Sequence, residues 1–83
     1  MGAWSNRGVS LRRLKKYEEA IAAYDKAIEI ELNSSFAWNN RGGVLMELER
    51  YQDALESVEK AIQIDPNNAN AQRRYQTILE KLN

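Results

Sequence analysis

Apolar residues recur in steps of three and four along the first part of the chain, which is the period of an amphipathic helix. One such run extends from Trp4 to Leu14, and a second extends from Tyr17 to Ile28. Very few residues separate the two runs, so the two helices must be antiparallel neighbours. The pattern therefore predicts a helical hairpin with helices over residues 3–14 and 18–31.

The same pattern returns after an offset of 34 residues, because segment 4–8 recurs as segment 38–42 with Trp, Asn, Arg and Gly at matching places. The Lys-Ala-Ile sequence at 26–28 recurs in the same way at 60–62. Self-similarity at one period and without gaps is typical of stacked repeats. The second copy predicts helices over residues 36–48 and 52–64.

The segment from Asp65 to Asn68 contains the one proline of the chain and predicts a firm end to the second hairpin. Proline cannot continue a helix, and Asn67 or Asn68 can cap a new helix. Residues 69–82 then carry one apolar and one polar face, as expected of a helix that closes a repeat array. We therefore expect a single all-α domain of about five helices, with repeat 1 at 1–34, repeat 2 at 35–68 and a capping helix at 69–83.

This combination of residues resembles the tetratricopeptide repeat, whose unit is a helix–turn–helix. The matching positions are Trp4, Gly8, Ala20, Tyr24 and Ala27 in the first unit, and Trp38, Gly42, Ala54, Ala61 and Pro66 in the second. The resemblance covers the whole chain. It implies a right-handed superhelix of helical hairpins that acts as a protein–protein interaction scaffold.

Two features need a physical account. A glycine inside a helix is unfavourable by about 1 kcal/mol relative to alanine, and close packing against the facing helix explains Gly8 and Gly42. Arg7 and Arg41 stand where the family usually has leucine. We expect their stems to pack while the guanidinium groups reach water or a glutamate on an adjoining helix, so that Arg41→Leu is neutral or stabilising.

The junction between the repeats leaves two alternatives open, because Leu32 stands where the family has a closing proline. Either the helix stops and Asn33, Ser34 or Ser35 caps the next one, or residues 31–35 join helices two and three into one long rod. The fused rod predicts a swapped dimer.

The composition excludes several classes of function. The 83 residues carry 12 basic and 12 acidic side chains, and no cysteine or histidine. The sequence shows no phosphate-binding loop and no nucleophile–base pattern, so we expect no enzymatic activity, no cofactor and no metal site. A neutral net charge argues against nucleic acid and anionic membranes. The absence of a signal peptide, cysteines and membrane segments favours a cytoplasmic location.

Binding is the remaining class, and the resemblance implies a concave face made by the first helix of each repeat and by the capping helix. Its implied lining residues are Gly2, Ser5, Asn6, Val9, Arg12, Arg13, Phe36, Asn39, Asn40, Gly43, Met46, Glu47, Asn70, Arg73 and Arg74. Asparagine offers a donor and an acceptor to the backbone of an extended peptide, and Arg73 or Arg74 can hold a carboxylate.

One branch of the family grips the C-terminal carboxylate of chaperones through two lysines, two asparagines and an arginine. Asn40 and Arg74 match that set, whereas Ser5, Val9 and Asn70 replace the others. Most of the positive charge is missing, and we therefore reject this ligand in favour of a generic peptide or protein segment.

The alternative function is structural. Trp4, Leu11 and Tyr17 lie on a flank with no preceding repeat to cover it, and an uncovered apolar edge is an association site. The chain also begins at the first position of a repeat. The alternative is therefore an excised or engineered repeat fragment whose main property is folding and self-association.

Overall fold

The computed structural model describes residues 3–83, which form five helices and no strands. The helices are α1 (Ala3–Arg13), α2 (Tyr17–Ile30), α3 (Ser35–Glu47), α4 (Tyr51–Ile64) and α5 (Ala69–Leu82). The all-α fold and the helices predicted from the apolar periodicity are confirmed. No helix in this part of the chain has the length and apolar character needed to cross a membrane.

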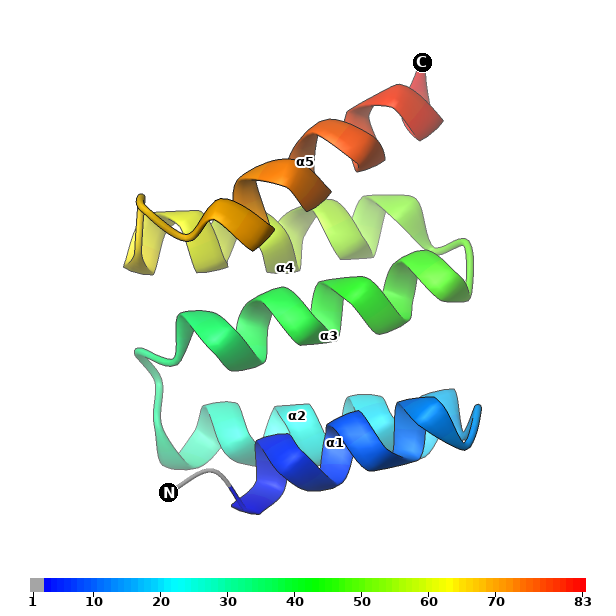
Figure 1. Cartoon of the computed structure of the whole chain (residues 1–83), viewed down its shortest axis with the longest axis vertical. Coiled ribbons are helices and arrows are strands. Elements are labelled where there is room, and N and C mark those ends of the chain that lie inside the picture. Colours follow the sequence, from blue (N-terminus) through cyan, green and yellow to red (C-terminus); the bar gives the residue numbers. More distant parts are fainter. Residues whose placement is uncertain (1–2) are drawn as a thin grey trace.

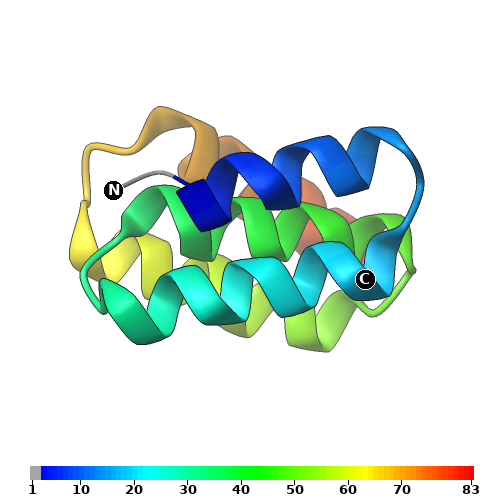
Figure 2. The same cartoon turned by 90° about the horizontal axis from the view of Figure 1, so that it is seen from below.

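The helices form two antiparallel hairpins, α1 with α2 and α3 with α4, and the hairpins stack along the long axis of the molecule (Figure 1). Helix α5 packs on α4 and follows the second hairpin. Viewed along the stack, α2 and α4 lie on one side, α1 and α5 on the other, and α3 between them (Figure 2). This order leaves α1, α3 and α5 as neighbours on one face.

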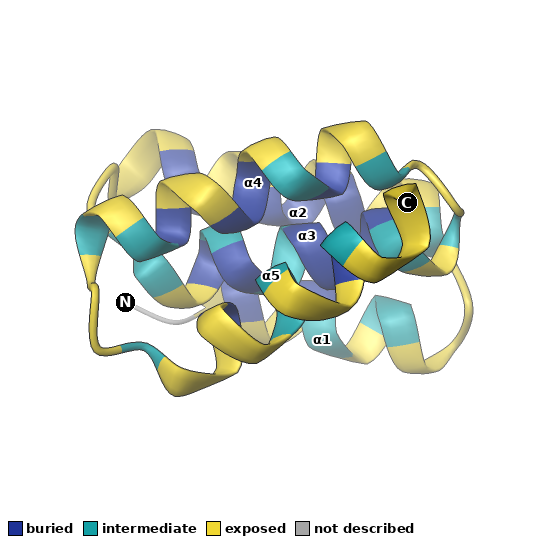
Figure 3. Ribbon diagram, turned by 90° about the horizontal axis from the view of Figure 1, so that it is seen from above, coloured by how far each residue is buried: buried dark blue, intermediate teal, exposed yellow. Residues whose placement is uncertain are grey.

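The core runs through the centre of the stack and takes large side chains from four helices. Tyr24, Leu45, Val58 and Ile78 are all buried almost completely, and the buried positions in Figure 3 lie where the helices face one another. Burial of such side chains is the main stabilising contribution, at about 25 cal/mol for each Å² of apolar surface.

Two of the helical glycines, Gly8 and Gly42, allow this close approach. A Cβ atom at Gly42 would lie 2.5 Å from Val58 Cγ2, and one at Gly8 would lie 2.7 Å from the Tyr24 ring. Both distances are shorter than van der Waals contact, so the missing side chains have a packing role, as the sequence predicts.

The turn within each hairpin uses a residue with a left-handed backbone conformation. Lys15 has a φ of 62° and Glu49, at the same place in repeat 2, has a φ of 61°. The amide of Lys16 donates to the carbonyl of Leu11 at 2.8 Å, and the equivalent bond forms in the second hairpin. This six-to-one bond is that of a Schellman motif, which is usually built with glycine at the left-handed position.

The junction between the repeats stops and turns. Helix α2 ends at Ile30, α3 begins at Ser35, and Ser34 Oγ accepts a hydrogen bond of 3.1 Å from the Ala37 amide. The fused rod is therefore not the form that this structure adopts. Leu32 remains 70% exposed in the connection.

The second junction repeats this arrangement and adds a link between helix ends. Asn68 Oδ1 accepts from the Ala71 amide at 3.1 Å, which confirms Asn68 as the predicted cap. Its Nδ2 group donates to Ser35 Oγ at 2.8 Å, and the Ser35 hydroxyl donates to the Ala61 carbonyl at 2.9 Å. The starts of α3 and α5 are thereby joined to the last turns of α4.

The Arg41 side chain lies between three helices. Its Nε atom is 2.7 Å from Asp25 Oδ1 on α2, and its Nη1 atom donates to Ser57 Oγ on α4. The guanidinium also lies 6.0 Å from the centroid of the Trp38 ring. The sequence suggested water or a glutamate as the partner, whereas the structure supplies an aspartate and a serine whose side chain is fully buried.

Candidate functional site

Some of the residues expected to form a concave face contact one another on the side of the molecule where α1, α3 and α5 are neighbours. Arg12 Nε on α1 lies 3.2 Å from Glu47 Oε1 on α3. On the other flank, Arg74 Nη1 of α5 donates to the carbonyl of Asn39 at 2.9 Å and to its Oδ1 atom at 3.0 Å. One stripe of α3 therefore lies between α1 and α5, and we call these three helix sides the inner face.

Arg74 is part of the floor of the inner face. A Cβ atom at Gly43 would lie only 2.9 Å from Arg74 Cζ, so the missing side chain makes room for the guanidinium. Burial lowers the pKa of Arg74, and the nearby Arg12 lowers it further. Because its hydrogen bonds end on Asn39, Arg74 holds α5 against α3.

At the opposite end of the inner face, the charged side chains are also paired with each other. Glu47 pairs with Arg12, and hydrogen bonding with Glu47, together with burial, raises the pKa of Tyr17. The one carboxylate on this stripe of α3 is thus already paired with a cation. A ligand carboxylate would have to compete with Glu47 for Arg12.

A buried phenol lies beneath the same region. Tyr24 is 0% exposed, and among the described residues its hydroxyl has no hydrogen-bond partner. Burial raises the pKa of Tyr24, and the positive charges of Arg12 and Arg74 oppose this shift. The repeat pattern marks Tyr24 as a core residue and gives no signal that its polar end is left unpaired.

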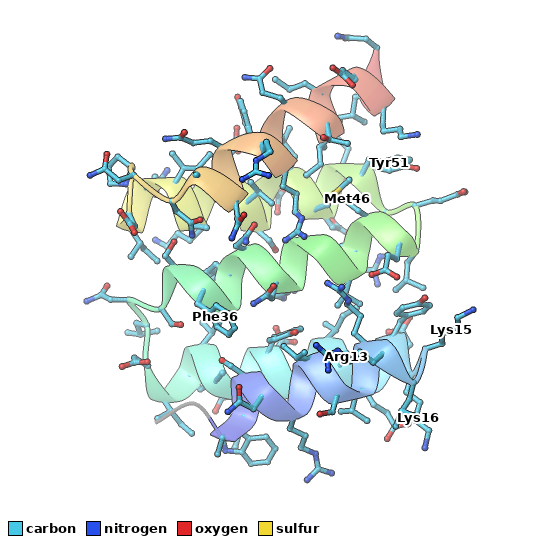
Figure 4. All side chains as sticks on the ribbon, viewed as in Figure 1. Arg13, Lys15, Lys16, Phe36, Met46 and Tyr51 are labelled. Atoms are coloured by element: carbon cyan, nitrogen blue, oxygen red, sulfur yellow. The ribbon has the colours of Figure 1, made fainter. Side chains whose placement is uncertain are left out.

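The other predicted residues differ in how much of them a ligand can reach. Ser5 and Asn39 are buried, at 7% and 5% exposure, and Phe36 is 53% exposed. The remaining exposed members are Asn6, Arg13, Asn70 and Arg73, and the half-buried members are Val9, Asn40 and Met46. Phe36 and Met46 lie near opposite ends of α3 (Figure 4). Gly2 lies outside the described residues.

Comparison with known proteins supports the resemblance found in the sequence. The family model of the tetratricopeptide repeat matches residues 2–34 and again residues 35–68. No curated protein matches the sequence.

Three solved structures show how similar the fold is. The second repeat domain of Spaghetti (RPAP3), bound to the HSP90 peptide SRMEEVD, has a TM-score of 0.94 at 25% identity, covering 96% of this chain and 74% of that one. The second repeat domain of human RPAP3, in complex with the HSP70 peptide SGPTIEEVD, has a TM-score of 0.85 at 27% identity, covering 95% and 68%. YrrB, described as a repeat protein with an unusual peptide-binding site, has a TM-score of 0.89 at 30% identity, covering 95% and 41%.

These structures extend beyond the length of this chain, which spans 74%, 68% and 41% of them. Two hairpins with glycine-mediated packing, a following helix and two adjacent family matches agree with one another. The chain belongs to the tetratricopeptide repeat family.

Proposed function

We propose that the chain is a protein-interaction module that holds an extended peptide segment across the inner face. The observation that carries this proposal is that Phe36 and Asn40 lie one helical turn apart on α3, at the helical spacing that puts them on the same side as Gly43 and Glu47. Phe36 offers an exposed ring for an apolar side chain of the ligand. Asn40 offers a donor and an acceptor for its backbone.

The peptide complexes of similar proteins support this role. Both RPAP3 repeat domains described above bind chaperone peptides, and the chain shares their fold over almost its whole length. The function carried over is the general one, the binding of a peptide by stacked helical hairpins, because a fold alone does not fix a ligand.

The chemistry of the inner face argues against a strongly acidic peptide. Arg74 is hydrogen-bonded to Asn39, and Arg12 is paired with Glu47. Ser5 and Val9 add no charge at the positions where the carboxylate-gripping relatives have lysine and asparagine. We therefore propose a ligand with an aromatic or aliphatic anchor next to Phe36 and few carboxylates.

The test begins with selection of peptides from a phage-displayed random library on the immobilised chain. A synthetic peptide of the selected sequence is then titrated by calorimetry against the chain and its variants. We expect Phe36→Ala and Asn40→Ala each to weaken binding by about tenfold, because truncated anchors typically cost more than about 1 kcal/mol.

Glu56→Ala and Gln63→Ala are the matched controls, since both residues are exposed on α4, away from the inner face. Their dissociation constants should stay within about twofold of the parent value. The SRMEEVD peptide is the second probe and should bind at least about tenfold more weakly than the selected peptide. Equal binding by the inner-face and control variants would refute the proposal.

Self-association is the second candidate function. Ile30 and Leu32, in and beside the α2–α3 connection, are 68% and 70% exposed. Two large apolar side chains in water next to a four-residue connection favour a swapped dimer, in which the connection straightens and each hairpin packs on the partner chain.

A further inference from the structure

Each repeat has a groove between its two helices, on the side turned away from helix α5. In repeat 2 this groove lies between α3 and α4, and Trp38, Arg41 and Ser57 line it. Asp25 and Ile28, which come from successive turns of helix α2 in repeat 1, line the same groove from its other side. A helix of the same chain therefore packs along this groove.

The two residues from α2 make different contacts. The Asp25 carboxylate pairs with Arg41 at 2.7 Å. Ile28 is only 8% exposed and belongs to a small apolar cluster against which Trp38 packs. An acidic residue followed three positions later by a branched aliphatic residue is thus the pattern that this type of groove accepts.

Repeat 1 carries the same groove between α1 and α2. Trp4, Arg7 and Ala23 line it, and these residues stand 34 positions before Trp38, Arg41 and Ser57. The arginine again lies over the indole, with 5.7 Å between Arg7 Cζ and the centroid of the Trp4 ring. The tryptophan and the arginine that line the groove of repeat 2 are therefore also present in the groove of repeat 1.

The first groove differs from the second in what its arginine meets. Arg7 is exposed, and within residues 3–83 it takes part in no ion pair. Ala23 supplies a methyl group where Ser57 supplies a hydroxyl that accepts from Arg41. Trp4 is 37% exposed. A carboxylate from outside is the partner that would satisfy Arg7, and the indole offers an apolar surface beside it.

We propose that the α1–α2 groove is a docking site for an amphipathic helix of a partner that carries an acidic residue and, three positions later, a branched aliphatic residue. The carboxylate pairs with Arg7 as Asp25 pairs with Arg41, and the aliphatic side chain packs on Trp4 as Ile28 packs near Trp38. The site is separate from the inner face, so it goes beyond the peptide binding proposed above.

The probe is a lactam-bridged helical peptide of 14 residues, the length of α2. It carries Asp and Ile three positions apart, with Ala, Glu and Lys elsewhere, and circular dichroism establishes its helicity before use. A second peptide has Asn in place of that Asp. Each is titrated into the isotope-labelled chain, and the indole cross-peaks of Trp4 and Trp38 are followed separately by NMR.

We expect saturable movement of the Trp4 indole cross-peak with little movement of the Trp38 one. The Asn peptide should bind at least about threefold more weakly, as expected for a partly exposed ion pair. Arg7→Leu should weaken binding of the Asp peptide by a similar factor and remove the difference between the two peptides. Arg7 has no packing partner in the core, so this variant should fold.

Four outcomes would overturn the proposal. The Trp4 cross-peak does not saturate up to about 1 mM peptide, the Asp and Asn peptides bind equally, or Arg7→Leu binds as well as the parent chain. Movement of the Asn40 and Phe36 signals in place of Trp4 would assign the peptide to the inner face and would equally refute docking in the α1–α2 groove.

Discussion

Arg41 joins repeat 2 to repeat 1 through Asp25, with 2.7 Å between Nε and Oδ1. The arginine side chain is 26% exposed and the aspartate side chain 50%, so the pair is partly open to solvent. Ser57, fully buried, accepts a second hydrogen bond from the same guanidinium. Arg7 occupies the same position in repeat 1 but has no such partners among the described residues.

Arg41→Leu should therefore lower the free energy of unfolding by about 1–3 kcal/mol, because it leaves a buried hydroxyl unpaired. Arg7→Leu should change it by less than about 0.5 kcal/mol, as at an ordinary surface position. Urea unfolding of both variants checks this. The sequence alone favoured a neutral or stabilising Arg41→Leu, and the buried partner Ser57 is the reason for the reversed expectation.

Ser57→Ala in the Arg41→Leu background is the control, since removing both polar partners should restore part of the lost stability. If Arg7→Leu and Arg41→Leu have equal effects, the contacts with Asp25 and Ser57 do not contribute to stability.

Replacing the left-handed residues of the hairpin turns by glycine should stabilise the protein. Lys15 and Glu49 hold φ values near 60°, a conformation that is unfavourable by about 1 kcal/mol for residues with a Cβ atom and open to glycine. Lys15→Gly and Glu49→Gly should each raise the free energy of unfolding by about 0.5–1 kcal/mol. Denaturant midpoints measure this gain.

Lys16→Gly is the matched control for that prediction, because Lys16 has an ordinary negative φ of −93°. It should give no gain in stability. Equal midpoints for Lys15→Gly and Lys16→Gly would show that the left-handed turn carries no strain.

The buried Tyr24 hydroxyl predicts a loss of stability at alkaline pH. Its pKa in the folded protein is raised above the ordinary value of 10.0, so the folded state favours the protonated phenol. This contribution is complete below pH 10.0 and is lost as the pH rises through the folded-state pKa. Tyr24→Phe should therefore lose less stability than the parent chain between roughly pH 8 and roughly pH 11.

At neutral pH the same substitution should be neutral or stabilising, because the hydroxyl has no hydrogen-bond partner among the described residues. Tyr17, whose pKa is also raised, should account for some remaining alkaline loss, and Tyr17→Phe separates the two contributions. Parallel stability curves for the parent and Tyr24→Phe would contradict the assignment to Tyr24.

Leu32→Pro tests the swapped dimer. Pro66 holds the equivalent place in the second junction, and proline disfavours the continuous helix that a swap requires. We expect light scattering of the parent chain to show a dimer fraction that grows with concentration, and Leu32→Pro to remain monomeric. A parent chain that stays monomeric at about 1 mM would remove the swapped dimer from consideration.

The helices and their packing could be predicted from the sequence because the information is local and repeated. Steps of three and four fixed the positions of the helices, and the small residues at Gly8 and Gly42 indicated where neighbouring helices touch. Ser34 and Asn68 were among the residues expected to cap helices. These features depend on short-range geometry that every copy of the repeat shares.

The arrangement of the inner face was harder to predict. Its position on α1, α3 and α5 followed from the family resemblance, but nothing indicated that Arg74 covers Gly43 and bonds to Asn39. Those residues come from different helices, α5 and α3, and the direction of a long flexible side chain depends on contacts that periodicity does not encode. For the same reason, the pairing of Arg41 with Asp25 could not be predicted from the sequence.

The link from Asn68 through Ser35 to the Ala61 carbonyl has a consequence for the order in which the array comes apart. It fastens the first turn of α5 to two other helices, whereas Leu82, near the other end of α5, is 37% exposed. Fraying should therefore begin at Leu82 and stop short of Asn68. Amide protons in the last turn of α5 should exchange with solvent well before the Ala71 amide, which the Asn68 cap protects.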